Sequence, residues 1–165
     1  MFELGPGNDP TTYNLLFVCT GNTCRSPMAA AIAEREKERR GWQHVAIRSA
    51  GTGAAEGAPA SPDTITVLGE HGIEPPDHAS TLLGAEDVRW ADLILVMSLS
   101  HMYAVSELGG GEKVALITDF IDGDELGRGV EDPYGAGIEA YRRAYEQLEQ
   151  AVMGLMARLE PILSP

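Results

Sequence analysis

Cysteine, basic side chains and long apolar runs are all scarce in this sequence of 165 residues. Its two cysteines are too few for a disulfide framework, which favours a reducing, cytoplasmic setting. Only 12 lysines and arginines oppose 25 aspartates and glutamates, and the resulting formal net charge of −13 disfavours nucleic acid and anionic membranes as partners. No apolar run approaches the roughly 20 residues that cross a bilayer. We therefore expect a cytoplasmic protein that binds neither nucleic acid nor a membrane.

The chain is long enough for one domain with a full hydrophobic core, and no repeat or linker divides it. Residues 1–13 lack the basic region and the long apolar stretch of a secretory signal, so they are expected to form a flexible N-terminal tail. Residues 14–160 are expected to form a single domain.

Apolar runs and amphipathic stretches alternate along that domain. Strands are predicted at residues 14–19, 44–49, 92–97 and 113–117, and helices at residues 26–40, 61–72, 99–108 and 136–160. This alternation is typical of an α/β protein with a parallel sheet between helices on both faces, a three-layer sandwich. The apolar stripe of the last helix favours packing on the sheet over a coiled coil. The alternating charges at residues 34–40 predict a solvated helix face.

The run Cys19-Thr20-Gly21-Asn22-Thr23-Cys24-Arg25-Ser26 lies where the first predicted strand ends and the first helix begins. Such a turn in a parallel sheet builds an anion site, because free backbone N–H groups and the helix dipole point at the same spot. A thiol held there is expected to be a nucleophilic thiolate. Arg25 adds a planar clamp for two oxygens of a tetrahedral anion. Thiolate and phosphate cradle together indicate a cysteine-dependent phosphatase.

These residues resemble the signature of the low-molecular-weight protein-tyrosine-phosphatase family, Cys-x5-Arg-Ser near the N-terminus. Two other stretches match the family in order and spacing, Ser49-Ala50-Gly51-Thr52 after the second strand and Asp132-Pro133-Tyr134 before the last helix. The resemblance extends from about Asn14 to about Leu159, so the single domain is expected to be a phosphatase domain. It implies a four-stranded parallel sheet in the order 2-1-3-4, which periodicity alone leaves open.

Three residues are the candidates for the catalytic chemistry. Cys19 is expected to attack phosphorus and form a phosphocysteine intermediate, while Arg25 holds the equatorial oxygens in the transition state. The resemblance implies that Asp132 protonates the leaving group and then accepts a proton from the attacking water. Sequence distance does not place Asp132 beside Cys19. The weaker acid candidates, none of which precedes a Pro-aromatic pair, are Asp119, Asp122, Asp124 and Glu131.

The remaining candidate binding residues lie in the same loop and on the pocket wall. They are Thr20, Gly21, Asn22, Thr23, Cys24, Ser26 and Tyr134. Gly21 lets the backbone approach a phosphate and Asn22 tolerates a left-handed conformation, although an ordinary turn favours the same residues. Ser26 before Pro27 is typical of a helix N-cap, and the resemblance adds a hydrogen bond from its hydroxyl to the Cys19 sulfur. Tyr134 is expected to line the pocket wall, although a single aromatic residue is equally consistent with a place in the core.

Cys24 has two interpretations that the sequence does not separate. It is either a redox partner that forms a reversible disulfide with Cys19 and protects the nucleophile, or a buried loop residue. A metal site is not indicated, because no further cysteine or histidine has the spacing of a ligand set. No organic cofactor is implied either, since the thiolate and Arg25 suffice for phosphoryl transfer.

Thr23 bears on the choice of substrate. Most tyrosine-specific members carry a bulky aliphatic residue here, whereas a threonine resembles the protein-arginine phosphatases of the same family. Tyr134 is followed by Gly135, which leaves less aromatic surface than a rim with two tyrosines. Glu56 is a candidate to face a cationic guanidinium, or else a solvated loop residue. We therefore expect hydrolysis of phosphoarginine in phosphorylated protein substrates, with phosphate or another oxyanion held in the loop.

Three alternatives remain beside this interpretation. A general tyrosine phosphatase would use the same machinery on phosphotyrosine. Thioredoxin-coupled arsenate reductases share the fold and the loop but need further cysteines downstream, and none follows Cys24. A non-catalytic phosphate-binding module would dispense with the nucleophile or the acid, yet Cys19 and Asp132 are both present.

Overall fold

The computed structural model describes residues 12–74, 77–122 and 128–164. Four parallel strands form one sheet in the order β2-β1-β3-β4, which confirms the predicted class and strand order. The strands are β1 (Tyr13–Cys19), β2 (Val45–Gly51), β3 (Leu93–Val96) and β4 (Val114–Leu116). Because every strand runs the same way, all the carboxyl ends meet at one edge, where open α/β sheets bind ligands.

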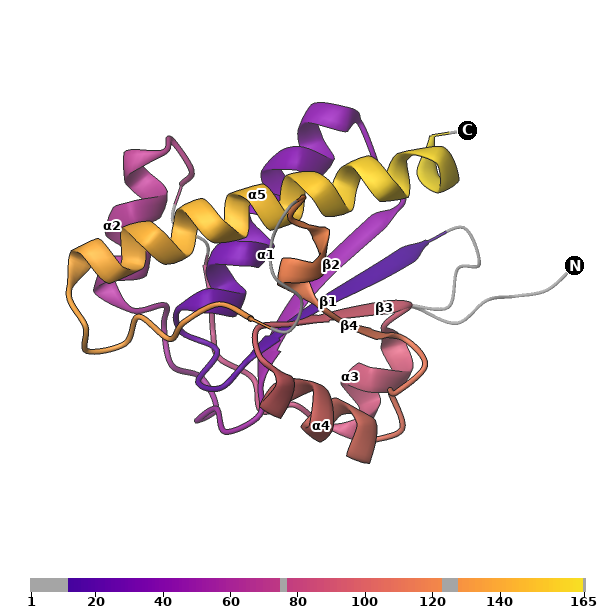
Figure 1. Cartoon of the computed structure of the whole chain (residues 1–165), viewed down its shortest axis with the longest axis horizontal. Coiled ribbons are helices and arrows are strands. Elements are labelled where there is room, and N and C mark those ends of the chain that lie inside the picture. The colour runs from indigo at the N-terminus through magenta and orange to yellow at the C-terminus, as the bar shows by residue number, and fades with distance from the viewer. Residues whose placement is uncertain (1–11, 75–76, 123–127, 165) are drawn as a thin grey trace, which may run out of the picture.

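Helices cover both faces of this sheet (Figure 1). One layer consists of α1 (Arg25–Arg40), α2 (Pro62–Glu70) and α5 (Ile138–Leu163), and the other consists of α3 (Ala85–Trp90) and α4 (Leu99–Glu107). Alternate residues of a strand face opposite ways, so Leu15 and Phe17 join the core beneath α1 and α5 while Leu16 and Val18 join the core against α3 and α4. A strand buried on both faces explains the unbroken apolar run of β1.

The long helix α5 packs along the sheet as its apolar stripe predicts. Tyr145, Leu148, Val152 and Leu155 on that stripe are fully buried in the core beneath α1. Among the described residues, no helix is long and apolar enough to cross a membrane.

Two short elements escaped the sequence analysis, the helix α3 and the 3-10 helix η1 (Ile117–Phe120). Six and four residues respectively are too few to show a helical period. Most of the expected N-terminal tail, residues 1–11, lies outside the described residues, and β1 begins at Tyr13, one residue before the expected start of the domain.

The charged end of α1 is not a solvated face throughout, and that expectation is wrong for one residue. Glu36 is 2% exposed and accepts hydrogen bonds from Arg35, Arg39 and Arg40 at distances of 3.0, 3.0 and 2.6 Å. Arg35 also reaches Glu149 of α5 at 3.1 Å, which joins the two helices. Burial raises the pKa of Glu36, but the hydrogen bonds from Arg40 and Arg35 outweigh it and hold this pKa below its ordinary value.

Replacement of Glu36 by glutamine tests this buried cluster. A carboxyl whose pKa is lower in the folded than in the unfolded state adds stability above the unfolded pKa and loses it as the pH falls through the folded pKa. We therefore expect Glu36→Gln to lower the free energy of unfolding by about 2 kcal/mol at neutral pH, with a smaller loss below about pH 4. Urea denaturation at both pH values measures this difference.

Glu34→Gln is the matched control, because the Glu34 side chain on the same helix is 47% exposed and its ion pair with Lys37 spans 3.9 Å. An equal and pH-independent loss for both variants would contradict a role for the buried carboxylate.

Candidate active site

The candidate residues gather around one cavity of about 400 Å³ at the carboxyl edge of the sheet. Its floor and rim come from the loop that joins β1 to α1, and Asp132 and Tyr134 approach from the segment before α5. The lining residues are Cys19, Thr20, Gly21, Thr23, Cys24, Arg25, Ala55, Ala58, Asp132 and Tyr134. The structure thus places Asp132 and Cys19 on the same cavity, a proximity that sequence distance left open.

The carbonyl groups of Cys19, Thr20 and Thr23 in this loop are bound by residues that do not line the cavity. Those of Cys19 and Thr20 accept hydrogen bonds from Thr52 N–H and Gly53 N–H at 2.9 and 3.0 Å. The Thr23 carbonyl accepts hydrogen bonds from Ser61 N–H and the Thr64 hydroxyl in the first turn of α2. In a trans peptide the N–H points opposite to the preceding carbonyl. The N–H groups that follow therefore face the cavity and form an anion-binding bowl.

Asn22 holds the loop in this shape from below. It is completely buried and adopts a left-handed backbone, with φ of 57°. Its side-chain amide donates to Ser26 Oγ at 2.7 Å and to Ser49 Oγ at 2.9 Å, and its Oδ1 accepts from Thr81 N–H at 2.9 Å. One side chain therefore ties the loop to α1, to β2 and to the segment at Thr81, and the predicted left-handed conformation at Asn22 is confirmed.

Close packing against this loop explains the glycine of the Ser-Ala-Gly-Thr stretch. A Cβ at Gly51 would lie 2.4 Å from the Thr20 carbonyl oxygen and 2.9 Å from the Asn22 nitrogen. No larger residue fits at this position without displacement of the loop.

The sulfur of Cys19 lies inside the bowl between two hydrogen-bonding groups. Ser26 Oγ lies 2.9 Å from Sγ, and Asn22 N–H donates to Sγ at 3.3 Å. Both contacts stabilise negative charge on sulfur.

The helix N-cap is Cys24 and no described side chain caps this end of α1, so the expectation that Ser26 is the N-cap is wrong. Its hydroxyl contacts the thiol instead, as the resemblance implied.

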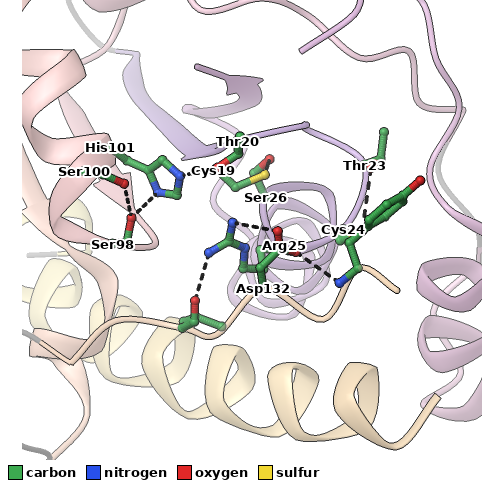
Figure 2. A network of polar contacts seen from close by, with 12 residues as sticks. Cys19, Thr20, Thr23, Cys24, Arg25, Ser26, Ser98, Ser100, His101 and Asp132 are labelled. Carbon is green, nitrogen blue, oxygen red and sulfur yellow. Dashed lines mark hydrogen bonds and ion pairs between the residues drawn. The ribbon is translucent and has the colours of Figure 1, made fainter. Parts of the chain in front are cut away.

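Arg25, the first residue of α1, is 5% exposed and reaches across the cavity to the segment before α5. Its Nη1 donates to the Val130 carbonyl at 2.9 Å, and its Nη2 lies 3.8 Å from Asp132 Oδ2 (Figure 2). These contacts leave further guanidinium N–H groups for an oxyanion. Asp132 is 54% exposed at the mouth of the cavity, and its Oδ1 accepts the Tyr134 N–H.

Several other candidate residues make their main contacts outside the cavity. Asn22 and Ser26 are fully buried and support the loop from behind. Glu56 accepts the Leu82 N–H at 2.7 Å and does not line the cavity. Both cysteines are free thiols, and Cys24 Sγ shares a hydrogen bond of 3.2 Å with Tyr141 Oη of α5. The disulfide with Cys19 stays a prediction.

Two histidines beside the loop escaped the sequence analysis. His78 Nε2 lies 2.6 Å from the Asn22 carbonyl oxygen, and His101 Nε2 lies 2.8 Å from Thr20 Oγ1. Single histidines outside any recognisable motif give no signal in a sequence, because only the fold brings them to the loop.

The family model for low molecular weight phosphotyrosine protein phosphatases matches residues 14–162. The chain belongs to this family. A protein-arginine-phosphatase of Geobacillus stearothermophilus is 41% identical over 150 residues, which are 90% of this chain and 97% of that relative. A low molecular weight protein-tyrosine-phosphatase of Streptomyces coelicolor is 37% identical over 155 residues, or 88% of this chain and 93% of the relative.

A solved structure of the arginine phosphatase YwlE, a mutant with a phosphorylated active site serine, is 35% identical to this chain and has a TM-score of 0.82. The match covers 89% of this chain and 95% of that one. The phosphatase described here therefore shares its fold with an enzyme of the same family over nearly the whole length of both proteins.

Removal of the Ser26 hydroxyl tests its contact with the sulfur. Hydrogen bonds to charged groups contribute about 1.5–3 kcal/mol, so Ser26→Ala is expected to slow alkylation of Cys19 by iodoacetate about tenfold or more at mildly acidic pH. Fragmentation mass spectrometry distinguishes Cys19 from Cys24 as the modified residue. Ser106→Ala, at an exposed position of α4, is the control. An unchanged alkylation rate in Ser26→Ala would show that the hydroxyl does not stabilise the thiolate.

Proposed function

We propose that this phosphatase hydrolyses phosphoarginine in proteins, with Cys19 as the nucleophile. The observation that carries the proposal is the composition of the rim. Thr23 lines the cavity, and the small side chains of Ala55 and Ala58 line it as well. At this position Thr23 offers a hydroxyl in place of a branched aliphatic side chain, and alanine side chains are too short to stack on a ring, which suits a polar guanidinium better than a phenol ring. The similarity to a protein-arginine-phosphatase supports the same substrate.

The first chemical step is an in-line attack of the Cys19 thiolate on phosphorus. The new S–P bond forms as the P–N bond to the substrate guanidinium breaks, and Asp132 in its acid form donates a proton to the departing nitrogen. Arg25 and the N–H groups of the bowl bind the three equatorial oxygens. The phosphorylated active site serine in the related YwlE mutant supports a covalent phosphoenzyme intermediate.

The second step hydrolyses the phosphocysteine. Asp132, now a carboxylate, accepts a proton from a water molecule while that water attacks phosphorus, and the S–P bond breaks to return the thiolate and inorganic phosphate. The exposure of Asp132 at the mouth gives water direct access to it, and its approach to Arg25 keeps its carboxylate on the side of the bowl (Figure 2).

One observation favours phosphotyrosine as an alternative substrate. The Tyr134 side chain is 73% exposed at the mouth of the cavity, where its ring is free to stack on a phenol. The similarity to a protein-tyrosine-phosphatase of Streptomyces coelicolor supports this alternative.

The setting that we propose for either substrate is the cytoplasm, because a reducing compartment keeps the thiols of Cys19 and Cys24 free.

Replacement of Thr23 by isoleucine separates the two substrates. The wild-type enzyme is expected to have the higher kcat/KM on a phosphoarginine peptide than on the matched phosphotyrosine peptide. Thr23→Ile is expected to lower the phosphoarginine value about tenfold or more and to preserve or raise the phosphotyrosine value, because a branched aliphatic side chain crowds a guanidinium and packs on a ring.

Thr66→Ile, at an exposed position of α2, makes the same change away from the cavity and serves as the control. A faster phosphotyrosine reaction that Thr23→Ile leaves unchanged would contradict the proposal and favour a general tyrosine phosphatase.

A further inference from the structure

The segment 97–101, which runs from the end of β3 into the first turn of α4, contacts both halves of the active site. On one side, the His101 ring reaches Thr20, the residue directly after the nucleophile, with 2.8 Å between Nε2 and Oγ1. On the other side, the Met97 carbonyl accepts the Val130 N–H at 2.7 Å, two residues before Asp132. One short segment therefore supports both the loop of the nucleophile and the segment of the proposed acid.

The His101 ring is fixed at both nitrogens. It is 2% exposed, and its Nδ1 lies 3.1 Å from Ser98 Oγ, which in turn lies 2.8 Å from Ser100 Oγ (Figure 2). Thr20 Oγ1 has no second partner among the described side chains. The orientation of the Thr20 hydroxyl thus depends on this ring.

The surroundings of His101 argue against a role in proton transfer. Burial and the charge of Arg25 lower the pKa of His101 to about 4, although Asp132 acts in the opposite direction. The ring is therefore neutral at physiological pH. It adds no second positive charge beside Arg25, and it is not an imidazolium that could act as the acid for the leaving group.

We propose that His101 is a positioning residue that keeps Thr20, and with it the first peptide of the bowl, in place before substrate binds. The Thr20 carbonyl is bound to Gly53 N–H on one side, and the side chain is bound to His101 on the other. Without the ring, the Thr20 hydroxyl rotates freely and the peptide that follows Cys19 loosens. Preorganised donors matter most when charge moves in the transition state. The loss therefore falls on kcat more than on the binding of phosphate. This inference rests on phosphatase activity of the site but not on the identity of the substrate.

A double-mutant cycle with p-nitrophenyl phosphate tests the inference. His101→Leu removes the ring nitrogens, and Thr20→Val removes the hydroxyl at constant shape. Each is expected to lower kcat on the order of tenfold, and the double variant is expected to lose no more than either single one, because both changes break the same contact. His101→Gln places an amide near the position of Nε2 and is expected to restore most of the activity.

Two inhibitors distinguish a positioning effect of His101 from a general disruption of the anion-binding loop. The inhibition constant of phosphate is expected to stay within about threefold in His101→Leu, whereas vanadate, which resembles the transition state, is expected to weaken in parallel with kcat/KM. His44→Leu makes the same substitution at the start of β2, the opposite end of the sheet, and is the control. Because the assay uses an aryl phosphate, it is independent of any preference for phosphoarginine.

Additive losses in the cycle would overturn the inference, and so would equal weakening of phosphate and vanadate. If His101→Leu does not fold, Thr20→Val decides the question alone: an unchanged kcat in that variant would overturn the proposal, and a loss with intact phosphate binding would support it.

Discussion

The buried amide of Asn22 organises the active site of this phosphatase. It spans Ser26 on α1, Ser49 on β2 and the backbone of Thr81, and the Asn22 side chain itself is completely buried. A buried polar group that lost these partners would be costly, so the loop has one favourable conformation. That conformation turns the carbonyls outward and the N–H groups toward Cys19. The bowl therefore exists before an anion arrives, and no binding energy is spent on forming it.

The fold supplies the anchors of this loop from every side. The loop after β2 holds the carbonyls of Cys19 and Thr20, the first turn of α2 holds the carbonyl of Thr23, and α4 reaches Thr20 through His101. Helices α2 and α4 lie on opposite faces of the sheet, and their contacts with the loop lie at its carboxyl edge. The loop and the Arg25 guanidinium also concentrate positive potential in a chain of net charge −13. An acidic surface and a phosphate site are therefore compatible.

The sequence allowed the main features to be predicted because they are local. The strand, the loop and the helix around Cys19 adjoin in the chain, so their geometry follows from backbone rules, and the strand order followed from a family resemblance. Contacts between segments that are distant in the sequence could not be predicted. The link from Arg35 beside Glu36 to Glu149 depends on where α5 packs, and the contacts of His78 and His101 depend on how the chain returns to the loop. The capping role assigned to Ser26 failed because the helix begins one residue earlier, at Arg25.

The central claim is that the sulfur of Cys19 itself takes the phosphoryl group. Rapid acid quench of the enzyme with substrate, followed by fragmentation mass spectrometry under conditions that preserve thiophosphate esters, tests it most directly in the Asp132→Ala variant, where hydrolysis of the intermediate is slowed. The account predicts a phosphoryl group on Cys19. A phosphoryl group on any other residue, or turnover without a covalent phosphoenzyme in either the variant or the wild type, would contradict it.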